Sequence, residues 1–306
     1  MVKRRSCSCI RIQPSVTSRK FKPIDNGQSA MERLIWVTDP HLDFLEDDGI
    51  DGFVGEMAHI GSDGVVVITG DIATAKNLDR TLDIIHKTVP RVFFVLGNHD
   101  AYGGSIAGVR EIACRFAGYL TARTEPVPLG PTTYLVGHDG WADGRAGDYY
   151  ASPVMLNDYV HIEELAGLSR QERFRQLNAL GDEAGAAVQT SLSRALATCR
   201  HVVLATHVPP FQDACWYKGK VADDEWAPHF SSRVMGEILM KVMAGHPDKH
   251  LTVLCGHTHS PGICQPMDNI MVYTGGAAYG QPMIQGVFEM GRMARFDGSF
   301  PLDFRY

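Results

Sequence analysis

The sequence predicts a layered α/β protein with a mostly parallel sheet at its core, and two observations lead to this prediction. From residue 34 onward, short apolar runs of strand length recur, and several of them end at a Gly, Asp, Asn or His cluster. Amphipathic segments of helical length separate several of these runs. Buried strands that alternate with helices are typical of a parallel sheet covered by helices.

Seven of the apolar runs are continuous rather than alternating, which indicates strands buried on both faces. In chain order they are LIWVTD (34–39), VVVITGD (65–71), RVFFVLGNHD (91–100), TTYLVGHD (132–139), HVVLATH (201–207), HLTVLCGHTH (250–259) and NIMVYTGG (269–276). Helical apolar spacing appears at residues 75–87, 105–120 and 231–245. The stretch 141–200 interrupts this rhythm with an aromatic, polar loop and a long helical region, and we expect it to form a cap-like insertion.

Length and charge exclude several classes of protein. The chain has 306 residues, of which 44% are hydrophobic and 21% charged, and this composition is that of a globular protein. Residues 1–30 contain seven basic side chains and one acid, so they carry +6 and the remaining chain carries −12 within a total of −6. An acidic body is a poor match for extended nucleic-acid binding, which depends on clustered Lys and Arg.

The first thirty residues differ from the rest of the chain. They are basic, rich in Ser and without periodicity, so we predict a disordered leader at 1–30 and a single domain over 31–306. The alternative is a transit peptide, which would make the protein organellar. No apolar run is long enough to span a membrane, and the seven cysteines include no CxxC pair. We therefore expect a reducing compartment, the cytoplasm, and no membrane partner.

Polar side chains that can bind metals follow several of the predicted strands. They are Asp39, His41, Asp71, Asn98, His99, Asp100, His207, His257 and His259. The carboxyl ends of parallel strands share one edge of a sheet, and ligands bind there. Imidazole, carboxylate and amide oxygen suit Mn, Fe or Zn, and the set is larger than one tetrahedral zinc site needs. Two ions about 3.5–4 Å apart with a bridging carboxylate would suit phosphoryl chemistry.

Five short motifs show a family resemblance. TDPH (38–41), TGD (69–71), GNHD (97–100), THVPP (206–210) and GHTH (256–259) resemble, in order and in strand context, the five blocks of the calcineurin-like metallophosphoesterases. The match covers nearly all of residues 34–280. It implies a four-layer α/β/β/α sandwich with two facing mixed β-sheets, two divalent metal ions and hydrolysis of a phosphate ester.

The resemblance also implies a role for each motif residue. One metal would be held by Asp39, His41, Asp71 and His259, and the second by Asp71, Asn98, His207 and His257. His99 would contact the phosphate and protonate the leaving oxygen. Asp100 would orient the His99 ring and favour its charged form. The reaction would be in-line attack of a metal-bound hydroxide on phosphorus.

Departures from the family patterns argue against two branches of the family. In the protein Ser/Thr phosphatases the second and third blocks resemble GDxxDRG and GNHE, whereas this chain has GDIATAK (70–76) and GNHD. Purple acid phosphatases place a Tyr where this chain has Thr74. The remaining group is the single-domain phosphoesterases that act on phosphomonoesters, phosphodiesters or nucleotides. Two alternatives are a phosphodiesterase specific for nucleotides or cyclic nucleotides, and a catalytically silent metal-binding scaffold for partner proteins.

Two loops contain residues that could contact a small phosphate ester or nucleotide. Candidate substrate residues are Trp141, Asp143 and Arg145 in DGWADGR (139–145), then Trp216, Tyr217 and Lys218 after THVPP, and also His229 and Tyr279. Arg145 would suit bidentate phosphate recognition. The alternative for the aromatic residues is loop packing, and for Arg145 and Lys218 it is simple solvation.

Overall fold

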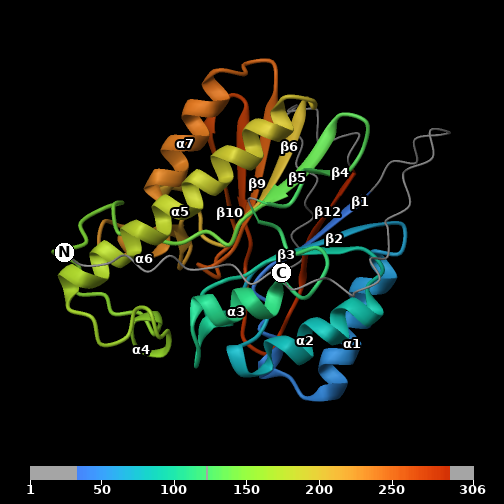
Figure 1. Ribbon diagram of the computed structural model, residues 1–306, viewed down its shortest axis with the longest axis horizontal. Helices are drawn as coiled ribbons and strands as arrows, with labels where there is room; N and C mark the ends of the chain where they lie inside the picture. Colours follow the sequence, from blue (N-terminus) through green and yellow to red (C-terminus); the bar gives the residue numbers. More distant parts are fainter. Residues whose placement is uncertain (1–32, 122, 290–306) are drawn as a thin grey trace, which may run out of the picture.

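Two large mixed sheets form the centre of the molecule (Figure 1). The computed structural model describes residues 33–289 apart from residue 122. The first sheet has the order β12-β1-β2-β3, in which β1, β2 and β3 are parallel and β12 is antiparallel to β1. The strands are β1 (Arg33–Val37), β2 (Gly64–Thr69), β3 (Val92–Val95) and β12 (Ile284–Glu289).

The second sheet has the order β10-β11-β9-β6-β5-β4 and is parallel except at its two edge strands. Its strands are β4 (Val127–Pro128), β5 (Thr133–Gly137), β6 (His201–Ala205), β9 (His250–Cys255), β10 (Gly262–Met267) and β11 (Ile270–Thr274). A separate hairpin joins β7 (Trp216–Tyr217) to β8 (Lys220–Val221). Each of the seven apolar runs of the sequence overlaps one strand of the two large sheets, as predicted.

Helices cover the outer face of each sheet (Figure 1). The first sheet is covered by α1 (Asp47–Ile60), α2 (Ala75–Thr88) and α3 (Ile106–Ala113), and the second by α5 (Arg170–Leu196) and α7 (Arg233–Ala244). Short helices are α4 (Asp158–His161) and α6 (Ala227–Phe230), with 3-10 turns η1 (Leu42–Phe44), η2 (His99–Ala101) and η3 (Gln212–Ala214). None of the described helices is long and apolar enough to cross a bilayer.

Three apolar layers explain why the strand sequences are continuous runs. In β1, Ile35 and Val37 pack toward the helices, while Leu34 and Trp36 pack between the sheets. The middle layer joins Trp36 to residues of the second sheet such as Leu254. Strands buried on both faces need apolar side chains at every position. The four-layer α/β/β/α prediction is confirmed.

One predicted helix is shorter than its sequence pattern. Residues 105–120 were expected to be helical throughout, but α3 ends at Ala113. Beyond it the chain turns back along β3, where Phe94 donates to the Gly118 carbonyl and accepts from the Leu120 amide. A Cβ on Gly118 would lie 2.2 Å from the Val92 carbonyl oxygen, so only glycine permits this approach.

The stretch 141–200 divides into two parts. Its second part is α5, which begins with a capping box between Ser169 and Glu172 and packs on the second sheet beside α7. Its first part includes α4, whose Asp158 reaches the site described below. The predicted leader at residues 1–30 lies outside the described residues.

Candidate metal centre

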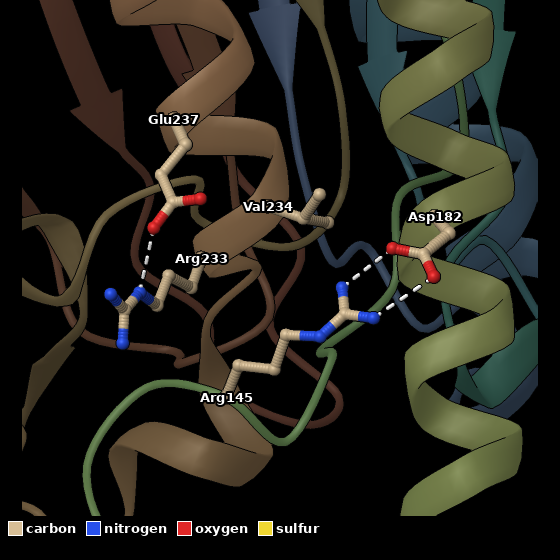
Figure 2. A pocket seen from close by; sticks show the side chains of 5 residues that line it. All are labelled: Arg145, Asp182, Arg233, Val234 and Glu237. Atoms are coloured by element: carbon tan, nitrogen blue, oxygen red, sulfur yellow. Dashed lines mark hydrogen bonds and ion pairs between the residues drawn. The ribbon is translucent and has the colours of Figure 1, made fainter.

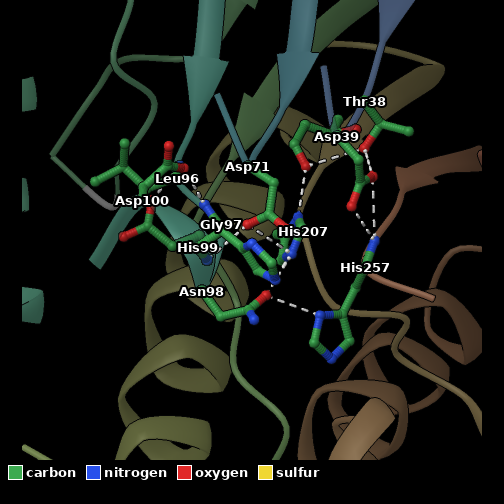
Figure 3. A network of polar contacts seen from close by, with 12 residues as sticks. Thr38, Asp39, Asp71, Leu96, Gly97, Asn98, His99, Asp100, His207 and His257 are labelled. Carbon is green, nitrogen blue, oxygen red and sulfur yellow. Dashed lines mark hydrogen bonds and ion pairs between the residues drawn. The ribbon is translucent and has the colours of Figure 1, made fainter. Parts of the chain in front are cut away.

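The motif residues lie at the carboxyl ends of strands from both sheets. Asp39, Asp71 and Asn98 follow β1, β2 and β3 of the first sheet. His207 follows β6, and the GHTH motif follows β9 of the second. The two strand edges meet there, and Figure 3 shows these side chains pointing toward one another. Topology therefore brings residues more than 200 positions apart into one cluster.

Four of these residues form a first group with the composition of a cation site. The ligand atoms of Asp39, His41, Asp71 and His259 all lie within 4.8 Å of one another. The Nε2 atoms of His41 and His259 are 3.0 Å apart, and His259 Nε2 is 3.4 Å from a carboxylate oxygen of Asp39. Two imidazole nitrogens and two carboxylates that converge in this way suit a divalent cation.

A second group gathers around the Asn98 side chain. The Asn98 Oδ1 atom lies 2.9 Å from His207 Nε2 and 2.9 Å from His257 Nδ1. The other ring nitrogen of His207 is 2.9 Å from the Thr69 carbonyl, and that of His257 is 3.2 Å from the His229 carbonyl. A carbonyl only accepts hydrogen bonds, so these outer nitrogens carry the ring protons.

The protonation of these two rings leaves lone pairs facing the amide oxygen. Burial lowers the pKa of His207, and burial lowers the pKa of His257 to about 4, so both rings are neutral at pH 7. Their inner nitrogens then hold no proton, yet they lie at hydrogen-bond distance from another acceptor. Converging acceptors with no proton between them are what a cation site requires.

Asp158 fixes the direction of the Asn98 amide. The Asn98 Nδ2 atom donates to a carboxylate oxygen of Asp158 at 2.8 Å, which turns Oδ1 toward the two histidines. The Tyr102 hydroxyl donates to the same Asp158 oxygen at 2.6 Å. No motif points to this residue, because it lies on α4, 60 positions from Asn98 and outside the five blocks.

Left-handed backbone conformations are concentrated at the site. Six described residues other than glycine have a positive φ, and only one of them, Lys218, lies outside the predicted ligand set. The other five are Asp39, His41, Asp71, His257 and His259, with φ between 42° and 73°. Such conformations cost about 1–3 kcal/mol each and persist where the surroundings impose them, often at functional sites.

Two motif glycines let the ligand loops approach each other. A Cβ on Gly97 would lie 2.1 Å from a carboxylate oxygen of Asp71, and a Cβ on Gly256 would lie 1.9 Å from one of Asp39. Atoms this close overlap, so any larger residue would displace the carboxylates. The glycines of GNHD and GHTH are therefore part of the geometry of the cluster.

The two carboxylates of the first group have opposite pKa shifts. Burial, together with Asp39 and Asp100, raises the pKa of Asp71 well above its usual range. Burial opposes ionisation of Asp39 too, but a hydrogen bond with His259 and the nearby histidines hold its pKa below the usual range. Burial and the neighbouring carboxylates outweigh the bond from the His99 amide, which favours the charged form of Asp71, and a bound cation would favour that form further.

His99 is held by its ring neighbours rather than by Asp100. Its ring stacks on Tyr102 with centroids 4.1 Å apart, and the His41 ring lies 4.7 Å away on an edge. Burial and the nearby histidines lower the pKa of His99 to about 2. The expectation of a charged imidazole is therefore wrong for the metal-free protein, because burial outweighs the attraction of the carboxylates.

Asp100 has a different role from the one expected. Its two carboxylate oxygens accept hydrogen bonds from the backbone amides of Ile72, Ala73 and Gly97 at 2.7–2.9 Å. Figure 3 shows Asp100 next to Gly97. The expectation that it orients the His99 ring is wrong, because the hydrogen bonds of the Asp100 carboxylate go to these amides and not to that ring. Asp100 instead ties the loop after β2 to the loop after β3, and so fixes the spacing of Asp71 and Asn98.

The candidate substrate residues at 141–145 have partners other than the predicted ligands. Trp141 is buried, and the Asp143 carboxylate accepts from the backbone amides of Arg145 and Val234. The Arg145 guanidinium forms two bonds with Asp182, at 2.6 and 2.9 Å, on the wall of a cavity of about 400 Å³ (Figure 2). Between them, α5 and α7 supply the other lining residues, Asp182, Arg233, Val234 and Glu237, and none of these is a predicted ligand.

The other candidate substrate residues lie nearer. The Lys218 amide donates to Ser260, beside His259, and Trp216 and Tyr217 lie on the same hairpin. His229 is buried, with its ring bonded to Tyr159 and Ser152 and its carbonyl bonded to His257. Tyr279 lies directly at the cluster, with its ring centroid 4.7 Å from that of His41.

Family membership follows from comparison with known proteins. The family described as calcineurin-like phosphoesterase matches residues 32–261, so this chain belongs to that family. The fold also resembles that of a dimetal phosphatase from Danio rerio, with 15% identity, a TM-score of 0.51 and coverage of 82% of this chain and 89% of that one. No curated protein matches the sequence.

Weaker structural similarities were also found. A 5'-nucleotidase from Candida albicans has 11% identity and a TM-score of 0.47, with coverage of 87% of this chain and 49% of that one. A Plasmodium protein described as an anchor in the inner membrane complex has 11% identity and a TM-score of 0.46, with coverage of 80% and 71%. The family match makes this chain a phosphoesterase-family protein with an Asp and His cluster that could bind metal ions.

Proposed function

We propose that the chain hydrolyses a phosphomonoester or phosphodiester with the help of two divalent cations. The first would be held by Asp39, His41, Asp71 and His259, and the second by Asp71, Asn98, His207 and His257. The observation that carries the proposal is the convergence of unprotonated acceptors around Asn98 Oδ1, next to a second group of the same kind. Divalent cations at these positions would lower the pKa of a water and offset phosphoryl charge.

The position of Asp71 supports its role as the bridge. One carboxylate oxygen is 3.7 Å from His41 Nε2 in the first group, and the other is 3.4 Å from His207 Nε2 in the second. The His99 amide donates to the second of these oxygens at 2.8 Å and so fixes the carboxylate plane. Each oxygen therefore faces one group.

His99 is the residue best placed to act on the substrate itself. It is partly exposed, and its ring lies against His41 at the edge of the first group. In its neutral form it carries one ring N–H, which can donate a hydrogen bond to a phosphoryl oxygen. The negative charge of a bound phosphate would favour the protonated ring, which could then give its extra proton to the leaving oxygen and return to the neutral form. The stack on Tyr102 keeps the ring in this place.

Replacing the bridge tests the proposal. Asp71→Asn removes one negative charge and one anionic oxygen from both groups, so we expect bound metal and hydrolysis to be lost together. Metal content would be measured by elemental analysis after loading with Mn, Fe or Zn. Turnover would be measured on phosphomonoesters, cyclic nucleotides, other phosphodiesters and nucleotides.

The matched control is Asp47→Asn, which removes an exposed carboxylate that pairs with Arg80 on the surface. This variant should keep both metal and rate. Near-normal turnover in Asp71→Asn would contradict the assignment of the bridge. Two bound ions in the unaltered chain without hydrolysis of any ester would favour the scaffold alternative instead.

A further inference from the structure

Two exposed aromatic rings lie at the rim of the candidate metal centre. Phe44 on η1 is 55% exposed, and Tyr279 in the loop before β12 is 48% exposed. Their ring centroids are 4.7 Å apart, and the rings are inclined by 34°. We call these two residues the aromatic shelf. They come from opposite ends of the chain and meet only because η1 and this loop flank the same strand edge.

The shelf is continuous with the predicted catalytic residues. The Tyr279 ring centroid is 4.7 Å from that of His41, 5.1 Å from that of His259 and 6.0 Å from that of His99. Phe44 extends the apolar surface outward, and its centroid is 6.1 Å from that of His41. A group attached to a phosphoryl unit near His99 would therefore reach Tyr279 first and Phe44 next.

The exposed surface of the shelf favours a planar, uncharged occupant. The side chains of Phe44 and Tyr279 are both more accessible than most aromatic residues of the core, so ring surface is open to solvent. The Phe44 ring has no polar atom and follows Asp43, so it offers no hydrogen bond to a second phosphate. A planar uncharged ring would instead cover the exposed apolar surface.

We propose that the aromatic shelf binds the planar base of a nucleotide substrate by stacking, while the metal centre holds its phosphate. The inference rests on the proposed function, and it narrows the substrate class to phosphate esters that carry a nucleobase. Stacking suits such a group because every base presents a π face, and aromatic side chains are the usual partners. Phe44 and Tyr279 are then specificity-determining residues.

Two pairs of esters separate the effect of the nucleobase from the effect of the bond that is broken. Adenosine 5'-monophosphate and ribose 5-phosphate break the same kind of bond and differ in the base. For a diesterase, the p-nitrophenyl esters of thymidine 5'-phosphate and of methyl phosphate release the same leaving group. We expect the unaltered chain to prefer the base-bearing member in kcat/KM. Phe44→Leu should reduce that preference by about five- to a hundredfold.

Matched variants separate the contribution of ring stacking from that of side-chain volume. Phe44→Leu keeps apolar volume but removes the π face, and Tyr279→Phe keeps the ring and should retain the preference. Tyr150→Leu alters an exposed aromatic residue, 53% accessible, that packs on Tyr149 and Phe174 instead. That variant should behave like the unaltered chain. An equal preference in Phe44→Leu and the unaltered chain, or none in either, would overturn the shelf.

A binding measurement distinguishes failure of the shelf from failure of the proposed function. Adenosine, which has no phosphate, would be titrated calorimetrically into the metal-loaded chain. Binding should weaken by about five- to a hundredfold in Phe44→Leu. Unchanged binding in this variant would overturn the shelf even if hydrolysis is observed. Absence of hydrolysis with every ester would overturn the proposed function, while this measurement would still decide on the shelf.

Discussion

Several of the predicted ligands are fixed by atoms outside the ligand set. The outer nitrogens of His207 and His257 donate to backbone carbonyls, and the Asn98 amide donates to Asp158. Such bonds choose the tautomer of an imidazole and the orientation of an amide before any ion binds. The left-handed backbone at five ligand positions is held in the same way, by bonds such as that from the Asp39 amide to the Gly70 carbonyl. The cluster is therefore preorganised.

At the residue scale, His99 can be separated from the metal ligands by substitution. His99→Ala should keep its metal content, because the ring lies beside the ligand atoms of the first group and is not one of them. The rate should fall by about 10²- to 10⁴-fold, the usual contribution of a general acid. The fall should be steeper for alkyl esters than for nitrophenyl esters, because a poor leaving group needs the proton more.

The comparison of two leaving groups makes this prediction specific. Steady-state rates would be measured for both esters together with metal content. His59→Ala, an exposed histidine on α1, serves as the control and should change neither. Loss of metal in His99→Ala, or an equal loss of rate with both esters, would show that the ring acts in another way.

At the scale of elements, α4 contributes Asp158 to the centre. In Asp158→Ala, the Asn98 amide loses the acceptor that orients it, and the Tyr102 hydroxyl loses its partner. Loss of such an outer contact typically weakens metal binding by about 10- to 100-fold. Competition with a chelator would measure the affinity for each ion. We expect the ion of the Asn98 group to lose more affinity than the other ion.

Tyr102→Phe is the matched variant for this prediction. It removes the second donor to the same Asp158 oxygen but leaves the stack on His99 and the bond from Asn98. We therefore expect a smaller effect on metal affinity than in Asp158→Ala. If Asp158→Ala binds each of the two ions as tightly as the unaltered chain does, α4 has no positioning role.

The sequence predicts best what lies within one element or its end. The strands and the polar residues that follow them were predictable because burial on both faces and strand-end motifs are local patterns. Asp158 and Phe44 were not predictable, since their importance depends on contacts between segments far apart in the chain. Asp100 was misjudged because its partners are backbone amides, which no side-chain pattern reveals.

At the scale of the whole molecule, the acidic charge of the chain is partly a property of its centre. Asp39, Asp71, Asp100 and Asp158 are buried at or beside one cluster. Burial raises the pKa of Asp71 and Asp100, so the charge of these two carboxylates opposes folding of the metal-free chain. Bound cations would offset this charge and would leave a local positive site for an anionic ester. Net charge alone therefore misrepresents what a phosphate ester would meet.

Buried histidines make the stability of the metal-free chain depend on pH. Seven described histidines have a pKa lowered in the folded state, mainly by burial, and two carboxylates, Asp71 and Asp100, have a raised one. The histidines are His41, His99, His138, His201, His207, His229 and His257. Below pH of about 6.5 the unfolded chain protonates these histidines and the folded chain does not.

The histidines outnumber the two carboxylates, so the unfolded chain binds more protons in the window from about pH 6.5 to about pH 4. The free energy of unfolding should therefore fall as pH drops through this window, by about 1.4 kcal/mol per pH unit for each net proton. Urea unfolding of the metal-free chain at several pH values would measure the slope. His201→Gln should reduce this slope by the contribution of about one proton, because burial lowers the pKa of His201 to about 4. The His201 ring bonds to Thr252, which is not one of the ligands. A free energy of unfolding that stays constant across this window would mean that these rings are protonated in the folded chain, which contradicts the tautomers inferred at the metal centre.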